Sequence, residues 1–121
     1  KYRERERNGR THFFKSLPIE YYGPLLKNAL CILGNSSSGI REAAFLGTPS
    51  VNIGTRQNGR QRGRNVIDVD YERGQIVAAA RKQIARREYE PDSLYGDGYA
   101  AEKIVRVLKT APLNVQKMIT Y

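Results

Sequence analysis

Three consecutive serines lie where a phosphate group could bind. Ser36, Ser37 and Ser38 follow the apolar run "LCILG", and the residues after them, "GIREAAFLG", have the spacing of a helix. Small residues between a buried strand and a helix let the backbone approach a ligand, and the first amides of a helix have no partner within it. The hydroxyls add donors, although a helix needs only one such serine as its N-cap. The block predicts a phosphate site.

One acid and one arginine extend this site toward a nucleoside diphosphate. Glu42 falls one turn into the predicted helix, where a carboxylate can accept hydrogen bonds from the two hydroxyls of a ribose. The alternative is that Glu42 only stabilises the positive end of the helix dipole. Arg56 follows the strand-like run "SVNIG" with one residue between, and its planar guanidinium suits a diphosphate. The sequence matches neither Walker A nor G-x-G-x-x-G, so triphosphate and dinucleotide binding lack their motifs.

A serine nucleophile is the alternative chemistry for the same block. The nucleophile elbow G-x-S-x-G fails by one residue, because Ser38 occupies the place of its second glycine. The only histidine, His12, precedes the serines, whereas the α/β-hydrolase order places it after them. We therefore expect no serine hydrolase and no catalytic duty for His12.

Strand and helix patterns alternate along the chain and would bring these residues to one edge of a sheet. Strands are predicted over residues 11–17, 30–34, 49–54 and 65–70, and helices over residues 18–29, 37–47, 74–87 and 98–110. This alternation predicts an α/β fold with a Rossmann-like parallel sheet and flanking helices. Ligands bind such sheets at the carboxyl ends of the strands, where the serine block and the loop that begins at Thr55 both fall.

Apolar residues predict which surfaces of these elements are buried. The strand at 30–34 is apolar on both faces, as a central strand should be. Gly47 should end the helix predicted at 37–47. Three of the helices have an apolar face that is expected to point inward. These faces are Ile40, Ala43, Ala44 and Leu46 in the helix at 37–47, Ile76, Val77, Ala80 and Ile84 in the helix at 74–87, and Ala101, Ile104, Val105 and Leu108 in the helix at 98–110.

Length and charge limit the class of protein. A chain of 121 residues suffices for one domain with one core. Its formal net charge of +9 favours anionic ligands. The one cysteine, Cys31, excludes an intrachain disulfide and indicates a buried thiol in a reducing compartment. No apolar run could span a bilayer and no signal peptide is visible, so we expect a cytoplasmic protein that does not bind membranes.

The serine block and its surroundings resemble one known family. The stretch "GNSSSGIREAAFLGTPSVNIGTRQNGRQRGRNVIDV" closely resembles the carboxyl-terminal domain of UDP-N-acetylglucosamine 2-epimerases, and the likeness runs from "FFKSLP" to "LYGDGYAAEKIVRVL". The loop "GTRQNGR" favours the hydrolysing branch, which gives N-acetylmannosamine and UDP in sialic-acid-type sugar biosynthesis. The resemblance implies a GT-B-like two-domain fold for the whole enzyme, in which the second domain holds most of UDP.

The same resemblance implies roles for residues of this chain. Ser36 and Ser37 would bind the diphosphate, Glu42 the ribose hydroxyls and Arg56 the nucleotide. The backbone near Leu17 would bind the uracil. Placement from the residues alone and the resemblance agree on the serine block and the acid.

The resemblance also implies what this chain lacks. The catalytic carboxylates belong to the family's first domain, and a key histidine lies in an HRxEN-like segment near the start of the second; neither is present here. We therefore expect residues 1–121 to be one partial domain, with residues 112–121 as a possible tail, that binds UDP but carries no catalytic residue, metal site or cofactor. Lys15 matches a position that contributes to feedback control by an activated sialic acid in the animal enzymes.

Expected partners follow from the same comparison. They are UDP or UDP-N-acetylglucosamine, the missing first domain and, in the full-length protein, a second copy in a homodimer. Alternative functions are a non-hydrolysing epimerase and a UDP-sugar glycosyltransferase, which would share the nucleotide-binding half. A nucleic-acid-binding module would explain the +9 charge, but the sequence holds no recognised nucleic-acid motif, so nucleic acid is not an expected partner.

Overall fold

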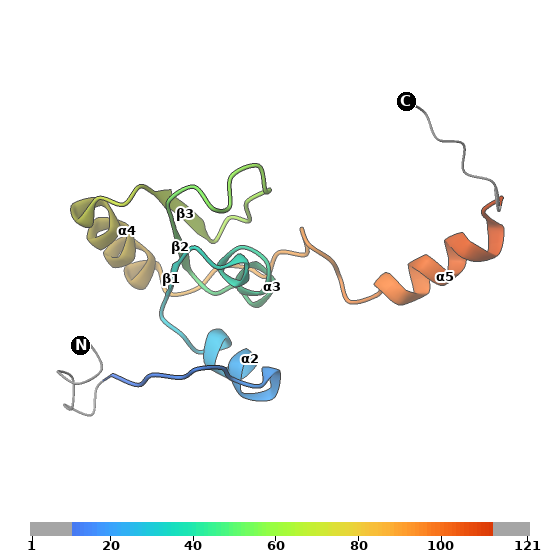
Figure 1. Cartoon of the computed structure of the whole chain (residues 1–121), viewed down its shortest axis with the longest axis horizontal. Coiled ribbons are helices and arrows are strands. Elements are labelled where there is room, and N and C mark those ends of the chain that lie inside the picture. Colours follow the sequence, from blue (N-terminus) through green and yellow to red (C-terminus); the bar gives the residue numbers. More distant parts are fainter. Residues whose placement is uncertain (1–10, 113–121) are drawn as a thin grey trace.

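A three-stranded parallel sheet forms the centre of the fold. The computed structural model describes residues 11–112. The strands β1 (Ile32–Gly34), β2 (Ser50–Ile53) and β3 (Val66–Val69) lie in the order β1-β2-β3, and both neighbouring pairs are parallel (Figure 1). Each strand is shorter than its predicted range. The prediction of a Rossmann-like parallel sheet is nevertheless confirmed.

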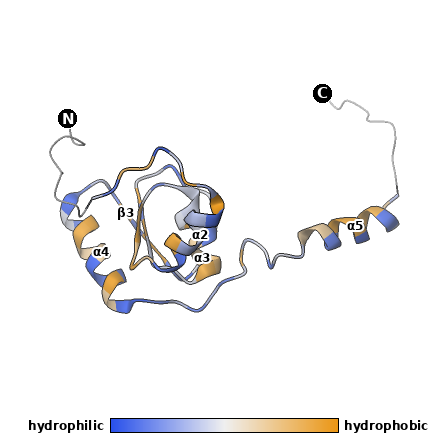
Figure 2. Ribbon diagram, turned by 90° about the horizontal axis from the view of Figure 1, so that it is seen from below, coloured by the Kyte–Doolittle hydropathy of each residue, from blue (hydrophilic) through white to orange (hydrophobic). Residues whose placement is uncertain are grey.

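Helices cover both faces of this sheet. The 3₁₀ turn η1 (Ser37–Gly39) and the helix α3 (Glu42–Leu46) lie on one face, and α4 (Arg73–Arg86) lies on the other (Figure 2). The helix α2 (Ile19–Lys27) packs beside α3. The single helix predicted at 37–47 is therefore a 3₁₀ turn followed by a short α-helix.

The buried core lies between the sheet and these helices. The predicted inward residues Ile40, Ala43 and Ala44 are at most 1% exposed, whereas Leu46 is only half-buried. Val51 in the central strand is also fully buried. The crossover between β1 and β2 is thus the best packed part of the described chain.

Two glycines allow this close packing. Gly39 lies against the sheet, where an added Cβ atom would stand 2.6 Å from Ser50 Oγ. Gly47 ends α3 in the left-handed region with φ 72°, which glycine adopts without steric cost. The prediction that Gly47 ends this helix is confirmed.

The first predicted strand is absent. Residues 11–17 form no strand and pair with none of the three strands of the described sheet. As a result β1 is an edge strand, and Leu33 within it is 51% exposed. The expectation that the run at 30–34 is buried on both faces is therefore wrong.

The helix α4 packs with a face that only partly matches the prediction, since Ile76 and Ala80 are half-buried. Its buried residues are Ala79 and Gln83, while Val77 and Ile84 are 41% and 42% exposed. Gln83 points inward because its side-chain amide donates to two backbone carbonyls, both at 2.7 Å. Hydrophobic periodicity does not detect a polar side chain that is buried for its hydrogen bonds.

The helix α5 (Ala100–Thr110) extends away from the sheet (Figure 1). The residues predicted to point inward are all exposed, among them Ile104 at 57%, Val105 at 50% and Leu108 at 61%. Figure 2 shows the apolar residues as an orange stripe along the helix. The helix itself is confirmed, and the burial predicted for Ala101 and the other three residues is wrong.

Two further expectations concern the ends of the chain and membranes. Most of the predicted tail at 112–121 lies outside the described residues. Within residues 11–112, no helix is long and apolar enough to cross a membrane.

Candidate functional site

Two loops meet at the carboxyl ends of β1 and β2. The backbone carbonyl of Asn35, directly after β1, accepts hydrogen bonds from Arg56 Nη1 at 3.0 Å and from Gln57 Nε2 at 2.7 Å. Both donors belong to the loop that follows β2. This junction brings Arg56 next to the start of the serine block, as the positions of both segments after parallel strands predicted.

The serine block forms a tight turn. Ser36 is the N-cap of η1, and its Oγ accepts from the Ser38 amide at 3.3 Å. The amides of Gly39, Ile40 and Arg41 donate to backbone carbonyls of the same turn. The expectation of unpaired amides is therefore wrong for residues 38–41. The donors that remain for a ligand are the serine hydroxyls and the amides at the start of the block.

A tyrosine that the sequence did not single out holds this turn. Tyr22 in α2 shares a hydrogen bond of 2.7 Å with the hydroxyl of Ser38. Ser37 differs from both neighbours, since its hydroxyl makes no hydrogen bond within the described part of the chain. Of the three serines, Ser38 therefore anchors α2, Ser36 caps the turn, and Ser37 is the one left to bind a ligand with its whole hydroxyl.

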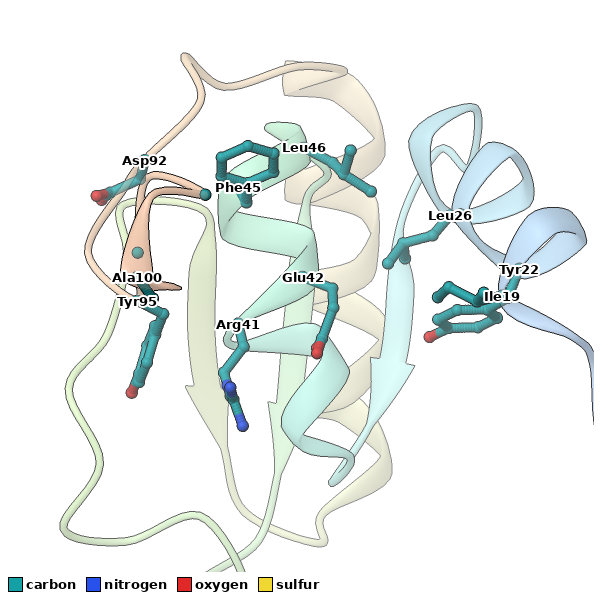
Figure 3. Close-up of a pocket in the computed structure, with 13 residues that line it drawn as sticks. Ile19, Tyr22, Leu26, Arg41, Glu42, Phe45, Leu46, Asp92, Tyr95 and Ala100 are labelled. Carbon is teal, nitrogen blue, oxygen red and sulfur yellow. The ribbon is translucent and has the colours of Figure 1, made fainter. Parts of the chain in front are cut away.

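Glu42 lies at a pocket beside the turn. The pocket has a volume of about 480 Å³ and lies between α2, α3 and the segment that leads to α5. Figure 3 shows Glu42 on α3 with Tyr22 and Ile19 across from it. The Glu42 carboxylate has no hydrogen-bonding partner among residues 11–112, so it is available to accept hydrogen bonds from hydroxyl groups.

The other side of this pocket carries a second charged residue. Arg41 lies beside Tyr95, with its guanidinium carbon 5.8 Å from the centre of the ring (Figure 3). The Tyr95 hydroxyl donates to the Gln61 carbonyl at 2.8 Å. Through Tyr95, the segment after α4 therefore contacts both Arg41 and Gln61, which belongs to the basic loop between β2 and β3.

Arg62 organises that basic loop. Its Nε donates to both carboxylate oxygens of Asp68 in β3, at 3.1 and 3.0 Å, and its Nη1 donates to the carbonyls of Gln57 and Arg60. Arg62 is therefore a structural residue of this loop, whereas Arg60 and Arg64 are exposed.

The surroundings of Asp68 lower the pKa of its carboxyl group. Desolvation raises it, but hydrogen bonds from Arg62 and Asn52 and the guanidinium charge outweigh that effect and hold the pKa below its ordinary value. Asn52 Nδ2 donates to the same carboxylate at 2.6 Å.

Two predicted residues lie outside this cluster. Leu17 immediately precedes Pro18, the N-cap residue of α2, and Lys15 is exposed in the segment before it. No hydrogen bond or ion pair in the described structure joins either residue to the serine block. The helix α2 connects this region to the site through Tyr22, which bonds Ser38, and through Ile19, which lines the pocket at Glu42.

Clustered metal ligands or a reactive thiol would be further candidate sites in the described part of the chain. Residues 11–112 contain no group of three His, Cys, Asp or Glu side chains that could hold a metal ion. Cys31 is partly buried rather than fully buried, and desolvation raises the pKa of its thiol. A raised pKa disfavours the reactive thiolate.

These observations define a Rossmann-like α/β domain with a candidate anion site at the carboxyl ends of its strands. The sequence model of the family described as UDP-N-acetylglucosamine 2-epimerase matches residues 2–109. The chain belongs to that family. The resemblance inferred from the serine block is thus confirmed.

Characterised relatives agree with this assignment. The chain is 41% identical over 85 residues to the UDP-N-acetylglucosamine 2-epimerase of Neisseria meningitidis serogroup B, which covers 70% of this chain and 22% of the relative. It is 44% identical over 91 residues to the UDP-N,N'-diacetylbacillosamine 2-epimerase (hydrolyzing) of Legionella pneumophila, covering 75% and 24%. It is 45% identical over 62 residues to polysialic acid biosynthesis protein P7 of Escherichia coli, covering 51% and 16%. The chain spans at most about a quarter of the length of these relatives.

Proposed function

We propose that this chain supplies the UDP-binding part of a hydrolysing UDP-N-acetylglucosamine 2-epimerase, which forms N-acetylmannosamine and UDP. The observation that carries the proposal is the junction at the Asn35 carbonyl, which holds Arg56 against the start of the serine block. An arginine and free hydroxyls at one point, with an unpaired carboxylate one turn further on, match a diphosphate followed by a ribose.

Each residue of the site then has a distinct task. The Ser36 and Ser37 hydroxyls donate to diphosphate oxygens, and the Arg56 guanidinium, which uses one nitrogen on Asn35, offers its remaining N–H groups to the same anion. Glu42 accepts hydrogen bonds from the ribose hydroxyls. The backbone near Leu17 binds the uracil.

The proposal leaves catalysis to residues outside this chain. In this proposal the one carboxylate of the site, Glu42, is occupied by the ribose hydroxyls, and residues 1–121 act as one partial domain that does not turn over substrate alone. The complete enzyme has a GT-B-like architecture, needs no cofactor, works in the cytoplasm and assembles as a homodimer. Lys15 is a candidate for regulation by an activated sialic acid.

The sugar and the reaction branch are separate questions from UDP binding. The Legionella relative is named for a diacetylbacillosamine substrate and for hydrolysis, whereas the name of the Neisseria relative does not include hydrolysis. Product analysis of the complete enzyme distinguishes the branches: release of a free 2-epimerised sugar with UDP supports hydrolysis, and an epimerised UDP-sugar supports the non-hydrolysing reaction. Transfer of the sugar to an acceptor would instead indicate a glycosyltransferase.

A calorimetric titration of the chain with UDP tests the proposal directly. Glu42→Ala and Arg56→Ala should each weaken saturable binding by about tenfold or more, because hydrogen bonds to charged groups contribute about 1.5–3 kcal/mol. Glu90→Ala and Arg81→Ala remove the same charges from exposed positions away from the site and should leave the affinity unchanged. A folded chain that does not bind UDP, or equal losses in all four variants, would contradict the proposal.

A further inference from the structure

Among residues 11–112, two glutamine side chains are buried, Gln57 and Gln83, and only Gln83 is fully hydrogen-bonded. Gln83 is 0% exposed; its Nε2 donates to the carbonyls of Ser50 and Asn65, and its Oε1 accepts from the Tyr89 hydroxyl, all at 2.7 Å. Every polar atom of that amide therefore has a partner. Gln83 is a structural residue that joins α4 to the sheet.

Gln57 differs from Gln83 because only part of its buried amide is hydrogen-bonded. It is 2% exposed, and its Nε2 donates to the Asn35 carbonyl at 2.7 Å, but its Oε1 has no partner among the described residues. A buried acceptor without a partner destabilises the fold, because it has lost its hydration without replacement. The hydrogen bond to the Asn35 carbonyl is therefore the polar contact that this buried amide makes within the described residues.

The geometry of the peptide group shows what the Gln57 amide controls. The bond between Asn35 and Ser36 is planar, and in the trans form its carbonyl and its N–H point in opposite directions. Donors from Gln57 and Arg56 hold the carbonyl toward the loop after β2. The N–H of Ser36, at the other side of the same plane, is thereby turned away from that loop.

We propose that Gln57 is a positioning residue of the nucleotide site: it fixes the Asn35–Ser36 peptide so that the Ser36 N–H points toward the diphosphate. The inference rests on the proposed function, which places the diphosphate at Ser36 and Ser37. The proposal adds the uncharged side-chain amide of Gln57 to the residues of the site. Because Gln57 carries no charge, it can hold the carbonyl without competing with Arg56 for the anion.

Loss of this donor should weaken diphosphate binding in particular. Without Gln57, the Asn35 carbonyl keeps a single hydrogen bond, from the exposed Arg56 side chain, and one exposed donor holds the peptide less firmly than two donors do. We expect Gln57→Met, which keeps the volume and removes the amide, to weaken pyrophosphate binding by about tenfold. Uridine, which lacks phosphate, should bind this variant as it binds the wild-type chain.

The test compares Gln57→Met with Gln83→Met by NMR titration with pyrophosphate, uridine and UDP, and it records the melting temperature of each variant. Gln83→Met should lower the melting temperature and leave all affinities unchanged while the chain is folded. Gln57→Glu, which places an acceptor against the Asn35 carbonyl, should weaken pyrophosphate binding further. In the wild-type chain, pyrophosphate should shift the amide resonance of Ser36, a readout that does not depend on any variant folding.

Three outcomes would overturn the inference. The first is unchanged pyrophosphate binding by folded Gln57→Met. The second is an equal loss of uridine and pyrophosphate binding that follows the fall in melting temperature, as in a purely structural role. The third is a Ser36 resonance that pyrophosphate does not move. If the wild-type chain binds UDP and one of these holds, the inference alone fails; if it binds no UDP, the proposed function fails with it.

Discussion

The helices α4 and α5 carry similar apolar patterns but have opposite surroundings. In α4 the inward face meets the sheet, and its buried residues are Ala79 and the polar Gln83. In α5 no residue is buried, although its apolar stripe is the more pronounced one. An amphipathic pattern therefore predicts that a helix forms and that one face can bind a surface. It does not say where that surface lies, and for α5 it is not among the described residues.

Core truncation should give the largest difference between these two regions. Ile40→Ala removes a fully buried side chain beside the sheet and should lower the free energy of unfolding by about 2–5 kcal/mol. Ile104→Ala in α5 removes a side chain that is 57% exposed and should change it by no more than about 0.5 kcal/mol. Urea unfolding of the chain measures both. Comparable losses would show that in solution α5 packs on the body of the domain, which is the sheet with η1 and the helices α2, α3 and α4.

A second substitution tests how tightly the body is packed. Gly39→Ala places a Cβ 2.6 Å from Ser50 Oγ and should destabilise the chain by about 1–3 kcal/mol. The double variant with Ser50→Ala should recover most of this loss, because the remaining neighbours lie at 3.7 Å or more.

Gly23 provides the matched control for that substitution. It lies within α2, and apart from its own helix and chain neighbours no atom lies within 4 Å of an added Cβ. The gain in helix propensity is opposed by crowding against Pro24, so Gly23→Ala should change stability by no more than about 1 kcal/mol. Failure of Ser50→Ala to rescue Gly39→Ala would mean that the backbone of the crossover, and not the serine hydroxyl, limits the space.

The smallest effect should come from pH. The pKa of Asp68 is lower in the folded chain than in the unfolded one, so Asp68 contributes stability above its unfolded pKa, about 3.9, and this contribution is lost as the pH falls through the folded pKa. Asp68→Asn should therefore make the melting temperature less dependent on pH between neutral pH and about pH 3.

Asp97 provides the matched carboxylate outside the body. A hydrogen bond from Lys103 at 2.6 Å lowers its pKa, and this pair joins α5 only to the residues just before it. Asp97→Asn should leave the unfolding of the sheet unchanged at every pH. An equal effect of the two variants would mean that the two regions unfold as one unit.

Sequence periodicity predicted the elements well because local rules determine them. The alternation of strands and helices, the end of α3 at Gly47 and the arrival of Arg56 near the serines all follow from spacing and from the geometry of parallel strands. The strand at 11–17 failed because a strand depends on a neighbour that spacing cannot supply.

The parts of the site that the sequence did not reveal depend on contacts between distant segments. The hydrogen bond between Tyr22 and Ser38 joins residues 16 apart, and the one between Gln57 and Asn35 joins residues 22 apart. A glutamine or tyrosine in a loop or helix carries no signal of such a contact. The proximity of Gln57 to Arg56 was the one hint that the sequence offered.

The hydrogen bonds of Gln83 also set the order in which the chain can complete its fold during synthesis. The Ser50 carbonyl is made 33 residues before the amide that pairs with it. At about 5–20 residues per second, this carbonyl waits roughly 2–7 s on the ribosome. The joint between the sheet and α4 therefore closes only after residue 83 has been made, and a chain that ends before it lacks the amide that bonds the Ser50 and Asn65 carbonyls.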